Sequence, residues 1–231
     1  QAPMWEPGTA SGYHPITVGY MVGELFRRAD GRTLGRALRE DLAAPFGLDV
    51  WIGLPDAEHD RVAQVRKPTA LPDLGELTEV RKAAFLNRGA SVGRRDAPEW
   101  RRAEIPSANG HATSLGLARL MAVVANGGVL DREPVLSPQT VAELTKSRIS
   151  GPDRVLPFNL SWAAGLLRND GLNIFGPGRQ AVGHYGWGGS VAMADPETGV
   201  SASYVMNRQS PHLIGDPRPV ALFEALYSAL R

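Results

Sequence analysis

Hydrophobic positions in the first half of the chain recur at helical spacing. The first predicted helix has one apolar face, formed by Val18, Met21, Val22, Leu25 and Phe26. A second helix is expected from Thr33, a candidate N-cap, to just before Pro45. Residues 113–127 and 137–147 predict two further helices, because each segment opens on a capping hydroxyl side chain. Residues 46–110 are less periodic, with a short strand expected near 50–52 and a helix near 76–87.

The pattern changes to strands after residue 150. Four are expected, at residues 160–167, 181–184, 189–194 and 200–207. The last two flank Asp195-Pro196-Glu197-Thr198-Gly199, whose Asp, Pro and Gly are typical of a tight hairpin loop. A final helix is expected after Asp216, with four side chains directed inward: Val220, Phe223, Tyr227 and Leu230.

This order of elements predicts an α+β fold, an antiparallel sheet flanked by helices plus a mainly helical lobe. Two domains are expected. Residues 1–150 form the helical lobe, and residues 151–231 form the antiparallel strands and the C-terminal helix.

Composition excludes several classes of function. The 231 residues carry 25 basic and 24 acidic side chains, so no strong overall charge favours nucleic acid or an anionic membrane surface. No apolar stretch approaches the ~18 residues of a membrane span. The absence of cysteine excludes disulfides, thiolate zinc sites and a cysteine nucleophile. The five histidines lack metal-ligand spacing, so neither a metal nor a cofactor is expected.

Generic nucleotide and hydrolase motifs do not match. Gly188-Gly189-Ser190-Val191-Ala192 fails the last position of a Gly-x-Ser-x-Gly nucleophile elbow. The glycine-rich run 183–189 has neither a Walker lysine nor the spacing of a dinucleotide-binding turn.

Three other segments stand out, although a tyrosine before a helix is often ordinary packing. The first is Pro7-Gly8-Thr9 followed by Tyr13-His14. The second is residues 105–110, Ile-Pro-Ser-Ala-Asn-Gly. The third is residues 183–199, which open on Gly-His-Tyr-Gly-Trp-Gly-Gly-Ser, contain Ala-Asp-Pro-Glu and lead into Tyr-Val-Met-Asn at 204–207.

In this order, the segments resemble the serine β-lactamase/penicillin-binding-protein-like superfamily, and above all its class C-like esterase branch, the family VIII carboxylesterases. The resemblance runs from Pro7 to the C-terminus. Tyr13 matches the family's tyrosine motif, His14 takes its variable second position, and Pro15 departs from the usual asparagine. His184-Tyr185-Gly186 matches the strand motif, with histidine in place of the β-lactamase lysine.

The resemblance implies a role for each matching residue. Tyr13 would take the proton of a nucleophilic serine, which requires a nearby cation because an ordinary phenol has a pKa of about 10. His184 would hydrogen-bond near Tyr13 or the substrate. Gly186 would let the strand approach the acyl group, and the Trp187 backbone N–H would donate to the oxyanion. His14 and Tyr185 are further candidates for the substrate side. Loss of the lysine favours neutral esters over penicillins.

The family's Ser-x-x-Lys nucleophile motif is absent. The three lysines, Lys67, Lys82 and Lys146, follow Gln64, Glu79 and Glu143 at that spacing. The nearest imitation, residues 91–94, ends in arginine, which cannot act as a base. We therefore expect an N-terminal segment carrying the nucleophile to be missing, and this chain alone to be inactive.

The sequence leaves three functions open. The first is the C-terminal portion of a serine carboxylesterase that acts on small neutral acyl esters through an acyl-enzyme. The second is a non-catalytic binding or assembly module, and the third is a β-lactamase, D-Ala carboxypeptidase or acyltransferase of the same fold. The expected partners are a small-molecule ester and no nucleic acid. A bare sheet edge and helix face would also attract the missing segment or a second copy.

Overall fold

The computed structural model describes residues 2–87 and 96–230, so residues 91–94 lie outside the described part. Small, mostly helical elements come first. They are α1 (Thr17–Asp30), α2 (Leu34–Ala37), the π-helix η1 (Leu38–Ala43), β1 (Val50–Ile52), the 3-10 helix η2 (Asp56–Arg61), α3 (Glu79–Phe85), α4 (Pro98–Arg102), β2 (Gly110–Ala112), α5 (Ser114–Ala125), β3 (Val129–Leu130), β4 (Glu133–Pro134) and α6 (Pro138–Thr145).

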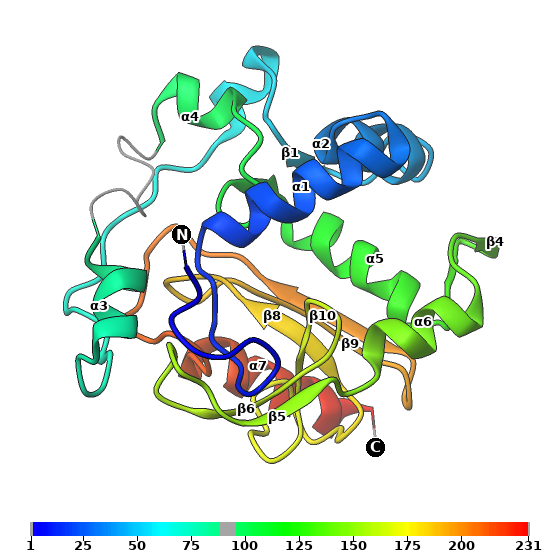
Figure 1. Cartoon of the computed structure of the whole chain (residues 1–231). Helices are drawn as coiled ribbons and strands as arrows, with labels where there is room; N and C mark the ends of the chain where they lie inside the picture. Colours follow the sequence, from blue (N-terminus) through cyan, green and yellow to red (C-terminus); the bar gives the residue numbers. More distant parts are fainter. Residues whose placement is uncertain (1, 88–95, 231) are drawn as a thin grey trace.

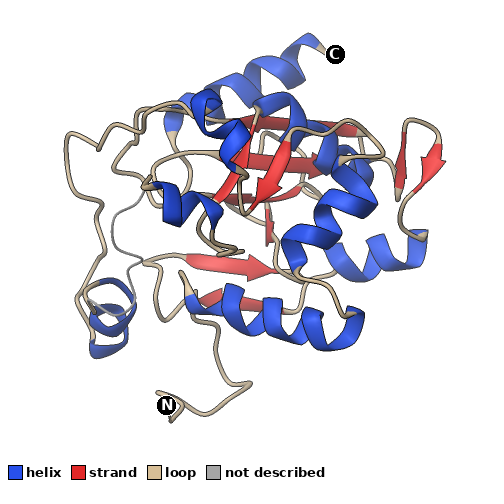
Figure 2. Cartoon of the chain, turned by 90° about the horizontal axis from the view of Figure 1, so that it is seen from above, coloured by secondary structure: helices blue, strands red, loops and turns tan. Residues whose placement is uncertain are grey.

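A six-stranded antiparallel sheet and one helix follow (Figure 1). The strands are β5 (Ile149–Pro152), β6 (Asn159–Trp162), β7 (Leu167–Arg168), β8 (Val182–Tyr185), β9 (Val191–Asp195) and β10 (Val200–Tyr204), and the helix is α7 (Pro217–Ala229). The strands lie side by side in chain order, with β10 at one edge and β5 at the other. In Figure 2 the strands lie between the C-terminal helix and the helices of the first part.

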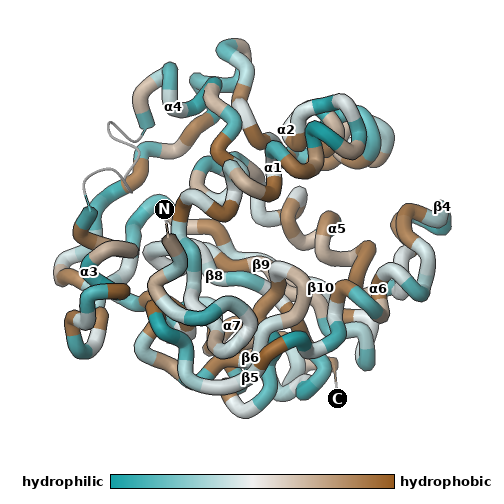
Figure 3. Tube along the Cα trace, viewed as in Figure 1, coloured by the Kyte–Doolittle hydropathy of each residue, from teal (hydrophilic) through white to brown (hydrophobic). Residues whose placement is uncertain are grey.

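Alternation along the central strands decides which side chains face each layer. Met193 and Tyr185 join Phe223 and Tyr227 of α7 in one core cluster. On the other face, Val182 and Ala194 join Val124 and Ala125 of α5. Figure 3 shows hydrophobic colours along the tube of α5. In β8, His184 comes two residues after Val182, and side chains two apart in a strand point to the same face. The His184 side chain therefore lies on the α5 side of the sheet.

The predicted caps are confirmed. The side chains of Thr33, Thr113 and Ser137 each accept a hydrogen bond from a backbone N–H of the helix that follows. Asp216 does the same for α7, accepting from the Arg218 N–H at 2.9 Å. One prediction for this helix is wrong: α7 ends at Ala229, so Leu230 lies past its end and is 60% exposed.

The strands differ from expectation in several places: β2, β3, β4 and β5 were not predicted, and β10 ends at Tyr204 and not at residue 207. The single strand predicted at residues 160–167 is instead two, because the chain reverses between β6 and β7. Gly165 adopts a positive φ of 78° in this turn, and Trp162 pairs with Leu167 across it. The predicted hairpin at Asp195 is confirmed, with Asp195 paired to Val200 and Gly199 at a φ of 69°.

Two apolar or unpaired surfaces remain uncovered within the described residues. The helix predicted at residue 18 is present as α1, but Met21 and Leu25 on its apolar face are 56% and 68% exposed. Strand β10 pairs only with β9, so its outer edge is open in the described part of the chain. Association through these surfaces stays a prediction. Across residues 2–87 and 96–230, no helix combines the length and hydrophobicity needed to cross a membrane.

Candidate active site

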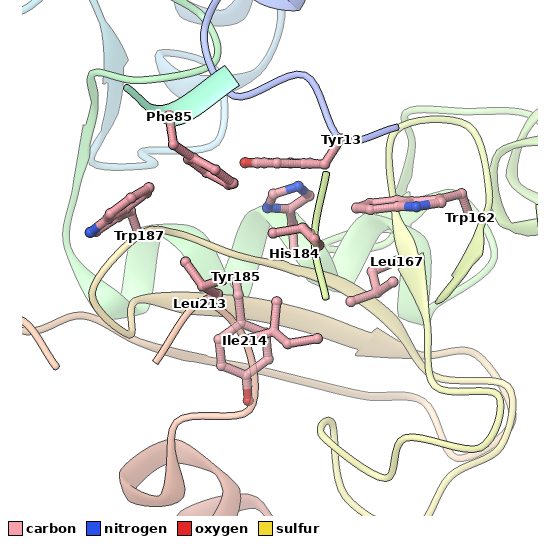
Figure 4. A pocket seen from close by; sticks show the side chains of 10 residues that line it. Tyr13, Phe85, Trp162, Leu167, His184, Tyr185, Trp187, Leu213 and Ile214 are labelled. Atoms are coloured by element: carbon pink, nitrogen blue, oxygen red, sulfur yellow. The ribbon is translucent and has the colours of Figure 1, made fainter. Parts of the chain in front are cut away.

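Three aromatic rings from distant parts of the chain meet above β8 (Figure 4). Tyr13 comes from the N-terminal loop, Trp162 from the end of β6 and His184 from β8. The Tyr13 and Trp162 rings stack with centroids 6.0 Å apart and an angle of 10°. The His184 ring lies 5.9 Å from Tyr13 and 6.0 Å from Trp162. The structure therefore brings together the two residues that the sequence nominated for catalysis, Tyr13 and His184.

A small cavity of about 20 Å³, roughly the space of one water molecule, lies beside these rings. Ten side chains line it: Tyr13, Phe85, Leu156, Trp162, Leu167, His184, Tyr185, Trp187, Leu213 and Ile214. This lining contains neither lysine nor arginine, and most of it is aromatic or aliphatic. The described lining therefore presents ring faces and a few polar atoms to a ligand, and none of its side chains carries a permanent positive charge.

Burial sets the protonation of the two central groups. It lowers the pKa of His184 below its ordinary value of 6.5, so the imidazole is neutral at pH 7. Burial, and then the negative charge of Asp153, raise the pKa of Tyr13 above its ordinary value of 10.0. In this chain Tyr13 is thus a neutral hydroxyl at pH 7 and can donate a hydrogen bond.

A tight turn after β8 places the predicted oxyanion donor. The Gly186 N–H donates to the Ser190 carbonyl oxygen at 2.7 Å, and a Cβ on Gly186 would lie 2.4 Å from the Ser190 hydroxyl oxygen. A side chain at this position would therefore have to displace the Ser190 hydroxyl. Next to it, Trp187 is 39% exposed and turns its ring edge toward Phe85 at 5.6 Å. Within the described residues, the Trp187 backbone N–H has no hydrogen-bond acceptor, which leaves it available to a ligand.

Tyr185 and His14, the two further candidates for the substrate side, are placed differently from Tyr13 and His184. Tyr185 points to the opposite face of the sheet from His184, where its hydroxyl donates to the Ile174 carbonyl oxygen at 2.8 Å. Tyr185 is nevertheless among the residues that line the cavity. His14 is exposed and is the hydrogen-bond partner of the Thr17 hydroxyl, away from the cavity lining. The structure does not bring His14 to the other site residues.

Sequence reasoning missed Phe85, Trp162 and Asp153. Trp162 lies within the strand predicted at residues 160–167, and its aromatic character was the available signal. Phe85 lies in the helix expected near residues 76–87, whose packing partner the local pattern does not specify. Asp153 contacts Tyr13 across 140 positions, and no local pattern indicates that contact.

Acidification below pH 6.5 is expected to reduce the free energy of unfolding. Because the folded state lowers the pKa of His184, the unfolded chain binds more protons between the two values, and stability falls as pH falls. Urea unfolding between pH 7 and pH 5 should therefore show a shallower pH dependence in His184→Gln than in the wild type.

A matched comparison is His111→Gln, because burial also lowers the pKa of His111 at a site away from the cavity. His111→Gln should reduce the pH dependence of the free energy of unfolding by the contribution of His111 alone. An unchanged slope in His184→Gln would contradict a buried, neutral His184.

The antiparallel sheet between helices, with Tyr13 and His184 facing each other at one strand, defines the β-lactamase/transpeptidase-like class of protein. The family model described as beta-lactamase matches residues 1–227, and the chain belongs to that family. The fold class expected from the sequence is confirmed.

Relatives place the chain further within this class. It is 35% identical to the esterase/beta-lactamase LipL of Mycobacterium tuberculosis, an alignment that covers 96% of this chain and 53% of LipL. A penicillin-binding protein homologue from Caulobacter crescentus superposes with a TM-score of 0.96 and 55% identity, over 99% of this chain and 61% of that one. A family VIII carboxylesterase superposes with a TM-score of 0.88 and 34% identity, again over 99% and 61%. The chain thus spans little more than half of LipL and about three fifths of these two structures.

Proposed function

We propose that this chain supplies the tyrosine, histidine and oxyanion-donor side of a serine carboxylesterase, with the Ser-x-x-Lys nucleophile on polypeptide outside these 231 residues. The observation that carries the proposal is the placement of Tyr13 against His184, close to a Trp187 backbone N–H that has no acceptor in the described part of the chain. The names of the relatives, an esterase/beta-lactamase and a family VIII carboxylesterase, support the same reaction class.

The substrates proposed are small neutral acyl esters. A penicillin carries a carboxylate, which is best held by a cation, and the described residues that line the cavity include neither lysine nor arginine. The aromatic and aliphatic side chains of the lining favour an apolar acyl or alcohol group instead.

The proposed reaction has two half-reactions. The serine hydroxyl attacks the ester carbonyl while its proton passes to Tyr13, and Tyr13 returns that proton to the departing alcohol. Water then attacks the acyl-serine while one of its protons passes to Tyr13, and Tyr13 gives that proton to the departing serine oxygen, which releases the acid and restores the serine. Because burial and Asp153 raise the pKa of Tyr13, the first step needs a cation beside the phenol, and the motif lysine would supply it.

The other proposed roles follow the same geometry. Trp187 would donate its backbone N–H to the developing oxyanion, with Gly186 shaping the turn that presents it. Neutral His184 would hydrogen-bond to Tyr13 or to the leaving alcohol. Tyr185 would support His184 from beneath the sheet, and His14 would act only at the outer rim.

A fluorophosphonate probe tests where the nucleophile lies. We expect no covalent label on the 231-residue chain by intact mass spectrometry, because Ser-x-x-Lys is absent from its sequence. The same probe should label a longer in-frame gene product at a serine upstream of Gln1. Stoichiometric label on the 231-residue chain would overturn the assignment, and a gene with no upstream Ser-x-x-Lys would favour the binding-module alternative.

Substrate choice separates the remaining alternatives. On the labelled longer protein, p-nitrophenyl butyrate should be hydrolysed faster than a chromogenic cephalosporin or a D-Ala-D-Ala peptide. The opposite order would replace the esterase by a β-lactamase or carboxypeptidase of the same fold.

A further inference from the structure

We infer that Asp153 is a positioning residue that fixes Tyr13 and Trp162 to one another and thereby sets the tyrosine over His184. Its catalytic meaning rests on the proposed function, whereas the positioning itself is a property of this chain. Asp153 lies in the loop between β5 and β6 and is 5% exposed.

The Asp153 carboxylate joins two of the three rings of the site. Its Oδ1 accepts a hydrogen bond from the Tyr13 backbone N–H at 2.9 Å. Its Oδ2 accepts from the Trp162 indole Nε1–H at 3.3 Å. The stacked pair Tyr13 and Trp162 is therefore anchored to the two oxygens of a single buried side chain.

The loop itself holds this carboxylate in place. Oδ1 also accepts from the backbone N–H groups of Val155 and Leu156, each at 2.9 Å. The Asp153 N–H donates to the Phe158 carbonyl oxygen at 3.0 Å, which closes the loop. With its rotamer and backbone both fixed, Asp153 presents a rigid acceptor to Tyr13.

The segment that carries Tyr13 depends on such an anchor. It precedes α1 and contains no helix or strand, so no ladder of backbone hydrogen bonds sets its position. A second bond, from the Arg154 N–H to the Ser11 carbonyl oxygen at 2.9 Å, attaches the same segment to the same loop. Without the Asp153 contact, the Tyr13 ring would be held mainly by stacking.

The negative charge of Asp153 also acts on the Tyr13 phenol. It raises the pKa of Tyr13, in addition to the larger effect of burial. The other titratable groups around the ring do not offset it: His184 on β8 is neutral at pH 7, His14 turns outward to Thr17, and the Arg154 guanidinium lies over the Trp5 ring. Asp153, which positions Tyr13, therefore adds to the effect of burial in favouring the protonated phenol.

Nuclear magnetic resonance on the whole 231-residue chain tests both effects. With [ζ-13C]tyrosine, and Tyr13→Phe to assign the signal, Tyr13 should titrate at lower pH in Asp153→Asn than in the wild type. In Asp153→Ala, which removes the acceptor oxygen, the Tyr13 amide should exchange about tenfold faster or more, the effect of losing one hydrogen bond of roughly 1.4 kcal/mol. In Asp153→Asn, the Trp162 indole N–H resonance should shift, because the new amide places a donor or a weaker acceptor beside it.

The matched control is Asp195→Asn. Asp195 is also a buried carboxylate that accepts a backbone N–H, from Glu197 at 3.1 Å, and a side-chain donor, the Tyr227 hydroxyl at 2.6 Å. This variant should move the Tyr227 signal and leave the Tyr13 titration and amide exchange unchanged. A general loosening of the fold would instead move both tyrosines in both variants.

Two results would overturn the inference. One is a folded Asp153→Asn chain with the wild-type Tyr13 titration, or a folded Asp153→Ala chain with the wild-type Tyr13 amide exchange. The other, which needs no variant and therefore decides the question if Asp153→Asn does not fold, is a wild-type Tyr13 amide that exchanges as fast as an unstructured loop. Neither measurement involves ester hydrolysis, so failure of the proposed function would leave both unaffected.

Discussion

Replacing Phe175 with alanine is expected to lower the free energy of unfolding by about 3–5 kcal/mol. Phe175 is fully buried, and its ring stacks on Tyr185 at 5.6 Å within the cluster between the sheet and α7. Removing the ring leaves a cavity that the surrounding strands cannot close without moving β8. Urea unfolding followed by tryptophan fluorescence measures the loss.

Two comparisons separate the cavity from other effects. Phe175→Leu keeps most of the apolar volume and should cost clearly less. Leu222→Ala removes a side chain that is 55% exposed on α7 and should stay within about 0.5 kcal/mol of the wild type. A Phe175→Ala chain as stable as Leu222→Ala would show that this cluster is not the main core.

Asn109→Ala is expected to cost about 3 kcal/mol or more, because the fully buried Asn109 side chain makes three hydrogen bonds. It accepts from the Ile105 N–H at 2.9 Å and donates to the carbonyl oxygens of Trp100 and Ala103 at 2.7 and 2.5 Å. Alanine would remove the partner that the Asn109 side chain supplies to each of these three backbone groups. Thermal or urea unfolding again gives the magnitude.

Asn126→Ala is the matched control, since Asn126 is exposed at the end of α5 and should tolerate the change within about 0.5 kcal/mol. Asn109→Asp keeps the acceptor but loses both donors, so it should also be strongly destabilising. A near-neutral Asn109→Asp would contradict the assigned donor roles.

Local chemistry accounts for the elements that the sequence predicts well. A hydroxyl or carboxylate before an apolar repeat caps a helix wherever the rest of the fold lies, as Thr113, Ser137 and Asp216 do. The loop from Asp195 to Gly199 likewise contains its own turn chemistry, including the Asp195 acceptor for the Glu197 N–H. Motif matching added Tyr13 and His184, whose rings the fold then brings within 5.9 Å.

The remaining features depend on distant partners. Residues 160 and 167 are both leucine, so the hydrophobic pattern alone does not separate two strands. Only the pairing of Trp162 with Leu167 shows that two strands are present. Tyr185 follows His184 directly, so strand alternation sends it to the opposite face and into the core. His14 directly follows Tyr13, and the local motif does not specify that the His14 side chain turns to the Thr17 hydroxyl.

The hydrogen bond between Tyr13 and Asp153 has a consequence for the order of folding. It joins residues 140 positions apart, and contacts of such long sequence separation form slowly because the entropy of closing the loop is lost before the contact stabilises anything. Asp153 becomes a fixed acceptor only after β5 and β6 have paired around its loop. The hairpins of the sheet should therefore form first, and the tyrosine should join His184 late, so that the site matures after the scaffold.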